Sequence, residues 1–378
     1  MPWVVWVLLF TLNAVPWIGF SIADIRAIDA HWLSRAGMLW GRDFSNQWLG
    51  GMFAIRGLNV YDHVEYQKAI EQFGITAFQN YSYPPHTLLV AAFFSLLPYP
   101  LALILWALLG SILFYYAAKP FVPFSPWLVL LVPSVARLPY GQFGLLTSAF
   151  TLLSMRGSGV AAGLLTMKPH LGVLLAPVLA VKKRFRQMVI ALVVTALLLT
   201  AAEALFGLGR AYLTQGIRTP ALLLQTSYDA AYFSVMPSAY VALRHTGWEW
   251  IGQAAVTVAA LFILWQFRRA SLQDLAFPLA TATFIVLPFS FAYDMALVSV
   301  GFAIILYCSW KDSGWPQRAL AIAAFSSPNL VWTHCVPLIL IAGLWLQLKV
   351  WRRTSAADDC AAAAMIPNQI EWVRGVQS

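Results

Sequence analysis

The sequence from Lys182 to Gly207 reads KKRFRQMVIALVVTALLLTAAEALFG, a basic cluster followed by an apolar run over 187–207 whose one charged residue is Glu203. As an α-helix, this run is long enough to cross the hydrocarbon core of a bilayer, which is about 30 Å thick. Lys and Arg at one end of such a run are typical of the cytoplasmic boundary of a transmembrane helix. The stretch therefore predicts a helix that spans a membrane.

Similar apolar runs recur along the whole chain. They predict an all-α polytopic membrane protein with about ten spanning helices. We expect one transmembrane domain over 1–353 and a low-complexity cytoplasmic tail over 354–378. The spans are expected near residues 3–22, 100–118, 121–136, 142–155, 187–207, 249–267, 274–290, 293–310, 316–333 and 335–350.

Composition supports a membrane environment. Hydrophobic residues make up 60% of the 378 residues and charged residues 10%, whereas an average soluble domain has about 25% charged residues. The net charge of +9 comes from short clusters at the ends of apolar runs, where they meet anionic head groups. We therefore expect membrane lipids as partners and no nucleic acid.

Two apolar stretches do not fit a simple crossing. Residues 84–98 are short and lead into Pro98-Tyr99-Pro100, and residues 157–181 are interrupted by Lys168-Pro169. Proline removes a helical hydrogen bond, and broken helices at membrane depth persist only where they are buried in protein or line a cavity. Both stretches are predicted to be broken or re-entrant segments.

The distribution of Lys and Arg predicts the orientation. If the N-terminus is cytoplasmic and both broken segments return to their own side, nearly every basic cluster falls in a cytoplasmic turn, as the positive-inside rule requires. This topology predicts a multi-pass plasma (inner) membrane protein with both termini cytoplasmic. It places the loop over 23–83 and the Tyr293-Asp294 pair outside, so the active site is expected to be extracytoplasmic.

The loop over 23–83 is rich in aromatic and charged residues, which predicts an ordered structure. Trp32, Leu33, Met38, Leu39 and Trp40 alternate with polar residues, a pattern typical of helices that lie in the membrane interface. Such helices can present both a lipid-borne substrate and an aqueous one.

Six short motifs occur in a fixed order, and together they resemble glycosyltransferase family 87 of the GT-C superfamily. Each motif alone is common in unrelated chains, whereas the ordered set is more specific. The resemblance covers roughly the first 310 residues. The motifs are Asp43-Phe44, Gly57 to Asp62, Tyr83 to Pro85, Gly141-Gln142, Lys168-Pro169 and Tyr293-Asp294.

The resemblance implies a GT-C-like helical bundle and transfer of a sugar, most often mannose, from a polyprenyl-phosphate carrier. The acceptor would be a hydroxyl of an extracytoplasmic glycan or glycolipid, and the sugar carbon would be inverted. The reaction needs a carboxylate that accepts the hydroxyl proton and a cationic or hydrogen-bonding cradle for the departing phosphate. The lipid-linked donor is the one co-substrate expected, and no further cofactor or metal is required by the sequence.

Asp43 is the expected catalytic base, because its motif matches the family position after the first span. Asp24 and Asp29 are rivals, and Asp43 could instead cap an interface helix or pair with Arg42. Lys168 stands in an apolar stretch, where a charge costs at least ~2.5 kcal/mol and indicates a functional site. It is expected to contact the carrier phosphate or to form a structural pair.

Asp294 could orient the sugar, pair with Lys168, or start a helix favoured by the helix dipole. Gln142 has an amide suited to sugar hydroxyls, although turn chemistry alone explains Gly141 beside it. The other predicted substrate-binding residues are Tyr83, of the Tyr-Pro-Pro motif, and the outer cations Arg137, Arg210 and Arg218, which could also meet lipid head groups.

The main alternative is a polytopic transporter or lipid flippase. Such proteins also use broken helices and intramembrane charges, and Lys168, Glu203 and Asp294 would then couple or gate transport. The long aromatic outer loop favours the enzyme, because transport does not require it. A purely structural scaffold has no reason to keep costly charges in its spans.

Overall fold

The structure is a computed structural model that describes residues 3–365, apart from 27, 29–31, 34–36, 38, 77–78, 136–140, 142 and 227–230. The described part is built from helices, which confirms the all-α prediction. The first half contains α1 (Trp3–Arg26), α2 (Arg42–Ile55), α3 (His63–Glu71), α4 (Thr87–Ser95), α5 (Tyr99–Ala118), η1 (Pro126–Leu131), α6 (Gly144–Met155), α7 (Gly159–Leu164), η3 (Leu165–Met167), η4 (Pro169–Gly172) and α8 (Leu175–Val181).

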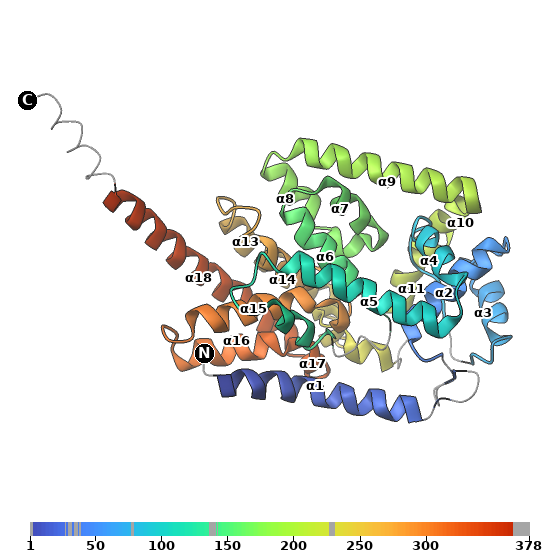
Figure 1. Cartoon of the computed structure of the whole chain (residues 1–378), viewed down its shortest axis with the longest axis horizontal. Helices are drawn as coiled ribbons and strands as arrows, with labels where there is room; N and C mark the ends of the chain where they lie inside the picture. The colour runs from blue at the N-terminus through green and yellow to red at the C-terminus, as the bar shows by residue number, and fades with distance from the viewer. Residues whose placement is uncertain are drawn as a thin grey trace, which may run out of the picture.

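The second half continues in the same way, and its last helix projects from the body of the molecule (Figure 1). Its elements are α9 (Phe185–Phe206), α10 (Gly209–Thr214), η5 (Gly216–Arg218), α11 (Thr219–Thr226), η6 (Ala231–Val235), α12 (Ala239–Ala242), α13 (Glu249–Gln266), α14 (Ala276–Val286), η7 (Ala292–Asp294), α15 (Ala296–Ser309), α16 (Trp315–Phe325), α17 (Ser327–Leu330), η8 (Val331–Thr333) and α18 (Val336–Met365).

Among the described residues, three helices are long and apolar enough to cross a membrane: α5, α9 and α13. Helix α9 ends at Gly207, whose positive φ of 63° forms the left-handed C-cap that glycine favours. Large apolar side chains on α9, such as Leu192 and Leu197, are exposed, as expected for a face in contact with lipid. The chain is a membrane protein, and the count of about ten spans stays a prediction.

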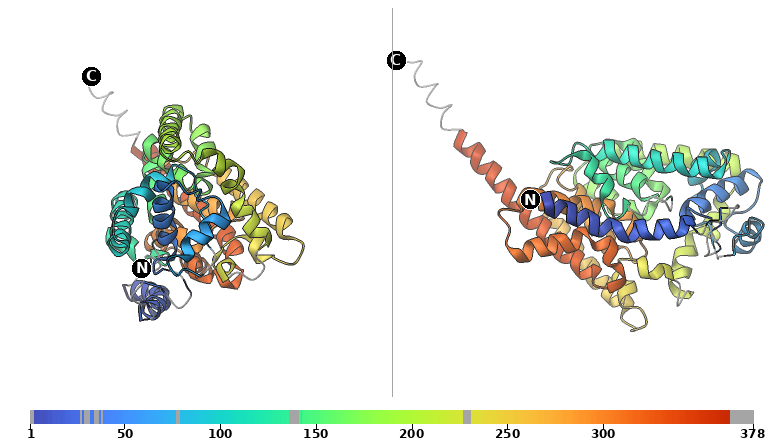
Figure 2. Two further views of the ribbon diagram at one scale, coloured as in Figure 1. Left: turned by 90° about the vertical axis from the view of Figure 1, so that its right-hand side faces the viewer. Right: turned by 60° about the horizontal axis from the view of Figure 1, so that its bottom comes forward.

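The bundle has two chemically different ends. Lys182 Nζ donates hydrogen bonds to the carbonyl oxygens of Arg268 and Ala270, and Arg352 Nη2 donates to Gln266 Oε1 at 3.1 Å. We call this the basic end. Helices α2, α3 and α4 lie at the opposite end, away from the start of α1 and from α18 (Figures 1 and 2).

Helix α5 connects the two ends. The hydroxyl of Tyr99, its first residue, donates to the carbonyl oxygen of Trp40 just before α2. Its 20 residues extend about 30 Å at 1.5 Å per residue, and the helix ends beside Lys119.

The span predicted over 121–136 is wrong. The described part of this stretch contains η1, a 3-10 helix of six residues, and no α-helix. The reason is visible in the sequence, where Pro120, Pro123, Pro126 and Pro133 recur every few residues. Each proline lacks the backbone N–H that a continuous α-helix needs, so apolar composition alone overestimated the helix.

Both stretches predicted to be broken are broken. Residues 84–98 contain only the nine-residue α4, and residues 157–181 are divided into α7, η3, η4 and α8. The division falls at Lys168, whose φ of −135° and ψ of 73° are not helical. A residue before proline is driven out of the α conformation by the proline ring, and here that residue is Lys168.

The first loop contains two helices, α2 and α3, but not at the residues whose alternation predicted them. The described residues between 32 and 40 are not helical, and Leu33 forms an isolated antiparallel bridge with Leu39. Helix α2 begins only after Gly41, whose φ of 89° sets the turn. Much of α2 is buried, in a core cluster that includes Phe44, Tyr61, Tyr81 and Trp106. This cluster fixes the loop to the bundle.

Candidate functional site

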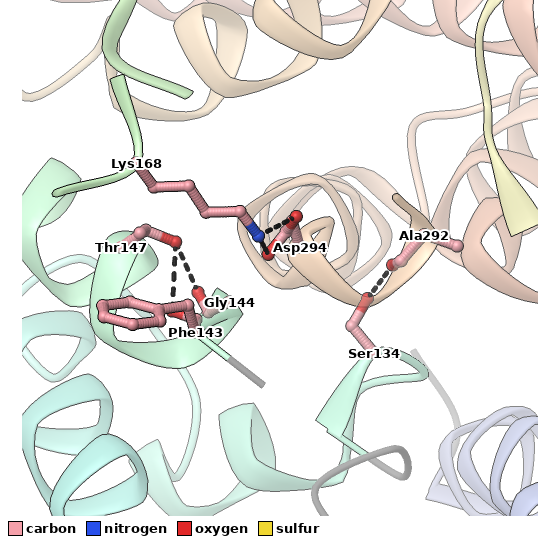
Figure 3. A network of polar contacts seen from close by, with 7 residues as sticks. All are labelled: Ser134, Phe143, Gly144, Thr147, Lys168, Ala292 and Asp294. Atoms are coloured by element: carbon pink, nitrogen blue, oxygen red, sulfur yellow. Dashed lines mark hydrogen bonds and ion pairs between the residues drawn. The ribbon is translucent and has the colours of Figure 1, made fainter. Parts of the chain in front are cut away.

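Lys168 and Asp294 form an ion pair inside the bundle. Lys168 Nζ lies 2.7 Å from Asp294 Oδ1 and 2.6 Å from Oδ2, and the two side chains are 3% and 0% exposed. Figure 3 shows the ammonium directed at both carboxylate oxygens. A buried charge is tolerated when it is paired. The pairing anticipated as one role for Asp294 is therefore present.

The backbone around Asp294 is held from two sides. The hydroxyl of Ser134 donates to the carbonyl oxygen of Ala292 at 2.9 Å, within η7. At the start of α6, a Cβ on Gly144 would lie 2.5 Å from the carbonyl oxygen of Tyr293 and 3.1 Å from Asp294 Oδ1. Only glycine allows this approach, which brings the carboxylate to the positive end of the α6 dipole.

Lys168 is oriented by its place in a broken helix. It ends η3 and precedes Pro169, so its backbone leaves the helical path and its side chain crosses toward η7. Its Nζ also lies 5.2 Å from the centre of the Tyr293 ring, within range of a cation–π contact. Tyr293 stacks on Phe291 with ring centres 4.9 Å apart.

Tyr83 links this ion pair to the first loop. Its ring lies 5.6 Å from that of Phe143, and its carbonyl oxygen accepts a hydrogen bond of 2.8 Å from the Tyr61 hydroxyl. Burial raises the pKa of the Tyr83 phenol, and the negative charges of Asp43 and Asp294 raise it further, against a smaller lowering by Gln47. Both carboxylates therefore act on one phenol, which stays protonated at neutral pH.

Asp43 is the second residue of α2, in the first turn, where the helix dipole favours a carboxylate. Its side chain is partly exposed. The neighbouring Phe44 contacts the turn before α6, because a Cβ on Gly141 would lie 2.3 Å from Phe44 Cβ. Gly141 has a φ of 69°. Gly141 and the start of α2 are thus fitted closely together.

Gln47 was missed by the sequence reasoning. It lies one helical turn after Asp43, on the same face of α2. It is buried, its Oε1 accepts a hydrogen bond of 3.3 Å from the Tyr81 hydroxyl, and its side chain affects the pKa of Tyr83. The spacing of four residues after Asp43 was the available signal. Ser134 was also missed, because a serine in an apolar stretch carries no charge to mark it.

The remaining predicted residues have different outcomes. Gln142 and Arg137 lie outside the described residues. Arg210 in α10 and Arg218 in η5 are exposed. Their segment lies near the same end of the molecule, since the Tyr212 ring contacts Tyr61 with centres 5.4 Å apart.

A small cavity lies beside the ion pair. Its volume is about 20 Å³, and Asp294 lines it together with the hydroxyl residues Thr147, Ser148, Thr151 and Thr283. This space suits a single water molecule, not a sugar. Within the described part of the chain, no group of three His, Cys, Asp or Glu side chains could hold a metal ion.

Comparison with known protein families identifies the family to which the chain is similar. The model of glycosyltransferase family 87 matches residues 81–299, more than half of the chain. The matched region includes Tyr83, Lys168 and Asp294, and it begins after Asp43. No curated protein and no solved structure matches the chain.

Proposed function

The chain belongs to glycosyltransferase family 87, and we propose that this membrane glycosyltransferase transfers a hexose from a polyprenyl-phosphate carrier, with mannose as the first candidate sugar. The acceptor is a hydroxyl of a glycan or glycolipid at the extracytoplasmic face. One observation carries the proposal. The close contacts of Gly141 with Phe44 and of Gly144 with Asp294 bring Asp43 and the Lys168–Asp294 pair to the same end of α6.

Asp43 is assigned as the general base. Its carboxylate takes the proton of the acceptor hydroxyl while the hydroxyl oxygen attacks the anomeric carbon of the donor sugar. The bond from that carbon to the phosphate oxygen breaks, and the electron pair leaves with the polyprenyl phosphate. Attack opposite the leaving group inverts the anomeric carbon.

The environments of the two carboxylates support this division of roles. Both oxygens of Asp294 accept hydrogen bonds from Lys168, and the side chain is fully buried, so an acceptor hydroxyl cannot reach it from the surface. Asp43 is partly exposed at the start of a helix, where an acceptor can approach it. A base must come within hydrogen-bond distance of the proton that it removes.

Lys168 and Tyr83 are assigned to the leaving group. The Lys168 ammonium has three N–H donors. The carboxylate of Asp294 orients this ammonium. A cation held in a water-poor site stabilises developing phosphate charge strongly. The raised pKa of the Tyr83 phenol keeps its proton in place. The phenol can therefore donate a neutral hydrogen bond to the phosphate without losing its proton to it.

The test replaces Asp43 by asparagine in the purified full-length protein and measures sugar transfer from a polyprenyl-phosphate mannose donor. We expect D43N to fold and to lose about 100- to 10,000-fold in rate, the usual contribution of a general base. The matched control is D62N. Asp62 accepts hydrogen bonds from the backbone N–H groups of Val64 and Glu65 as the N-cap of α3, a role that asparagine also fills.

Full activity in D43N would refute the assignment of the base. Transport of the lipid-linked sugar across a liposome membrane without any new glycosidic bond would favour the flippase instead. Glu203 gives that alternative no support, because it is exposed and its Oε2 accepts a hydrogen bond from the Gly209 backbone N–H at 2.7 Å. This contact is a structural cap on the turn after α9.

A further inference from the structure

A second cavity lies at the basic end of the bundle. Its volume is about 350 Å³, and residues from the turn before α14, from α15 and from α18 line it. Phe277 at the start of α14 and Gly301 in α15 are on its wall, and it shares no lining residue with the small cavity beside Asp294. The cavity is therefore separate from the site around Tyr83.

Gln347 of α18 has an unusual position in this cavity. Its side chain is only 5% exposed, and neither its Nε2 nor its Oε1 has a hydrogen-bond partner among the described residues. A Cβ on Gly301 would lie 3.2 Å from Nε2, so glycine leaves room for the amide at the cavity wall. An unsatisfied buried polar group costs about 1 to 3 kcal/mol, which indicates that something else satisfies this amide.

The other residues that line the cavity indicate which class of ligand it can bind. Gln273 and Asp274 add polar groups from the turn before α14, and Phe121, Phe267 and Trp351 add flat apolar surfaces. The volume exceeds that of one water molecule, about 30 Å³ of liquid, and these aromatic walls offer water few partners. A ligand with several hydroxyls on a carbon skeleton suits both kinds of surface, because each hydroxyl both donates and accepts.

The surroundings carry positive charge. Pro120 on the cavity wall follows the exposed Lys119, and Phe267 on the wall precedes the exposed Arg268. Arg352, also exposed, follows Trp351. Anionic lipid head groups are attracted to such basic clusters at a membrane surface. Each of these three cations adjoins a wall residue rather than lining the cavity itself. A phosphate at the membrane surface would meet the cations there, and head-group hydroxyls would reach the amide and the carboxylate inside.

We propose that this cavity binds the polyhydroxylated head group of an anionic phospholipid from the leaflet at the basic end, with Gln347 as its central hydrogen-bonding residue. Such a lipid would fix α18 against α14 and α15 without entering the glycosyl-transfer site. The proposal concerns binding alone and does not depend on the catalytic roles of Asp43 or Lys168.

The test uses the purified full-length protein in delipidated detergent solution and measures thermal unfolding during titration with defined lipids. We expect phosphatidylglycerol to raise Tm more than phosphatidic acid, which has the phosphate without the extra hydroxyls. The variant Q347L should bind phosphatidylglycerol about tenfold more weakly, the loss expected when one or two hydrogen bonds disappear.

The matched control is Q253L. Gln253 of α13 is also buried, but its Nε2 donates to the carbonyl oxygens of Ile285 and Val286 and its Oε1 accepts from the Tyr240 backbone N–H. Without lipid, Q253L should lower Tm, whereas Q347L should maintain or raise it because it removes an unsatisfied amide.

Three results would overturn the proposal. Equal stabilisation by phosphatidic acid would show that the hydroxyls are not recognised. A loss of lipid-free Tm in Q347L equal to that in Q253L would show that the amide is satisfied within the protein. Stabilisation by free glycerol 3-phosphate as strong as that by the lipid would identify a soluble ligand instead.

Discussion

The Lys168 and Asp294 ion pair joins two side chains that are 126 positions apart in the chain. Removing one member leaves the other buried and uncompensated, which costs about 3 to 5 kcal/mol, whereas replacing both by apolar residues is often nearly neutral. We therefore expect K168M and D294L each to lower Tm strongly, and K168M/D294L to recover most of the loss. Thermal unfolding of the four proteins in one detergent measures the coupling.

Measuring sugar transfer by the same four proteins distinguishes a structural role of the ion pair from a catalytic one. The double variant should remain inactive despite its recovered stability, because it has neither the cation for the leaving phosphate nor the carboxylate that orients it. A double variant with wild-type transfer would make the pair purely structural. Losses of Tm that simply add would show that the two charges are not coupled.

Sequence reasoning found the charged members of the site and Tyr83, and it missed Gln47 and Ser134. Lys168 and Asp294 stand out because a charge in an apolar stretch is costly and rare. Gln47 and Ser134 carry no such signal, since neutral polar side chains occur in many helices without a role. Their positions became clear only when the fold brought α2 to Tyr83 and the stretch before α6 to η7.

At the scale of elements, α6 has a glycine with positive φ near each end. Gly141, before it, and Gly157, after it, have positive φ values of 69° and 99°, which cost an L-residue about 1 to 2 kcal/mol. A Cβ on Gly141 would also overlap Phe44, whereas a Cβ on Gly157 meets nothing within 4 Å. We expect G141A and G157A both to lower Tm, with the larger loss in G141A.

Only G141A should lower the rate of sugar transfer, because Phe44 is the neighbour of Asp43 and its displacement moves the proposed base. A misplacement of about 1 Å can cost roughly 100-fold in rate. Assays of sugar transfer, corrected for the folded fraction, compare the rates of G141A and G157A. Equal rates in the two variants would show that the contact between this turn and α2 does not position Asp43.

Hydropathy predicted the long elements well and the irregular ones poorly. The predicted spans over 100–118 and 249–267 differ from α5 and α13 by one residue at a single end, because lipid-facing helices are apolar along their length. The span predicted over 121–136 was wrong because the prediction rested on apolar content and did not take the repeated prolines into account. The helices expected among residues 32–40 failed for a related reason, since Gly37 and Gly41 turn the chain with positive φ.

At the scale of the whole molecule, the orientation of the bundle decides which face meets the substrates. The basic clusters gather at one end, whereas Asp43 and Tyr83 lie with α2 and α4 toward the other. Because lysine and arginine near spans favour the cytoplasmic side, we propose that the basic end is cytoplasmic and that sugar transfer occurs outside. The start of α1 and the described part of α18 lie on the same side of the molecule (Figure 1), which agrees with both termini facing one compartment.

Single cysteines can test this orientation in intact cells that express the chain without its three native cysteines. Glu71 at the end of α3 and Arg186 at the start of α9 are both exposed. A membrane-impermeant maleimide should label E71C in intact cells and R186C only after permeabilisation. The reverse pattern would place the Asp43 loop in the cytosol. An enzyme in that orientation would have to meet its lipid-linked donor before the sugar crosses the membrane, so the extracytoplasmic part of the proposal would be lost.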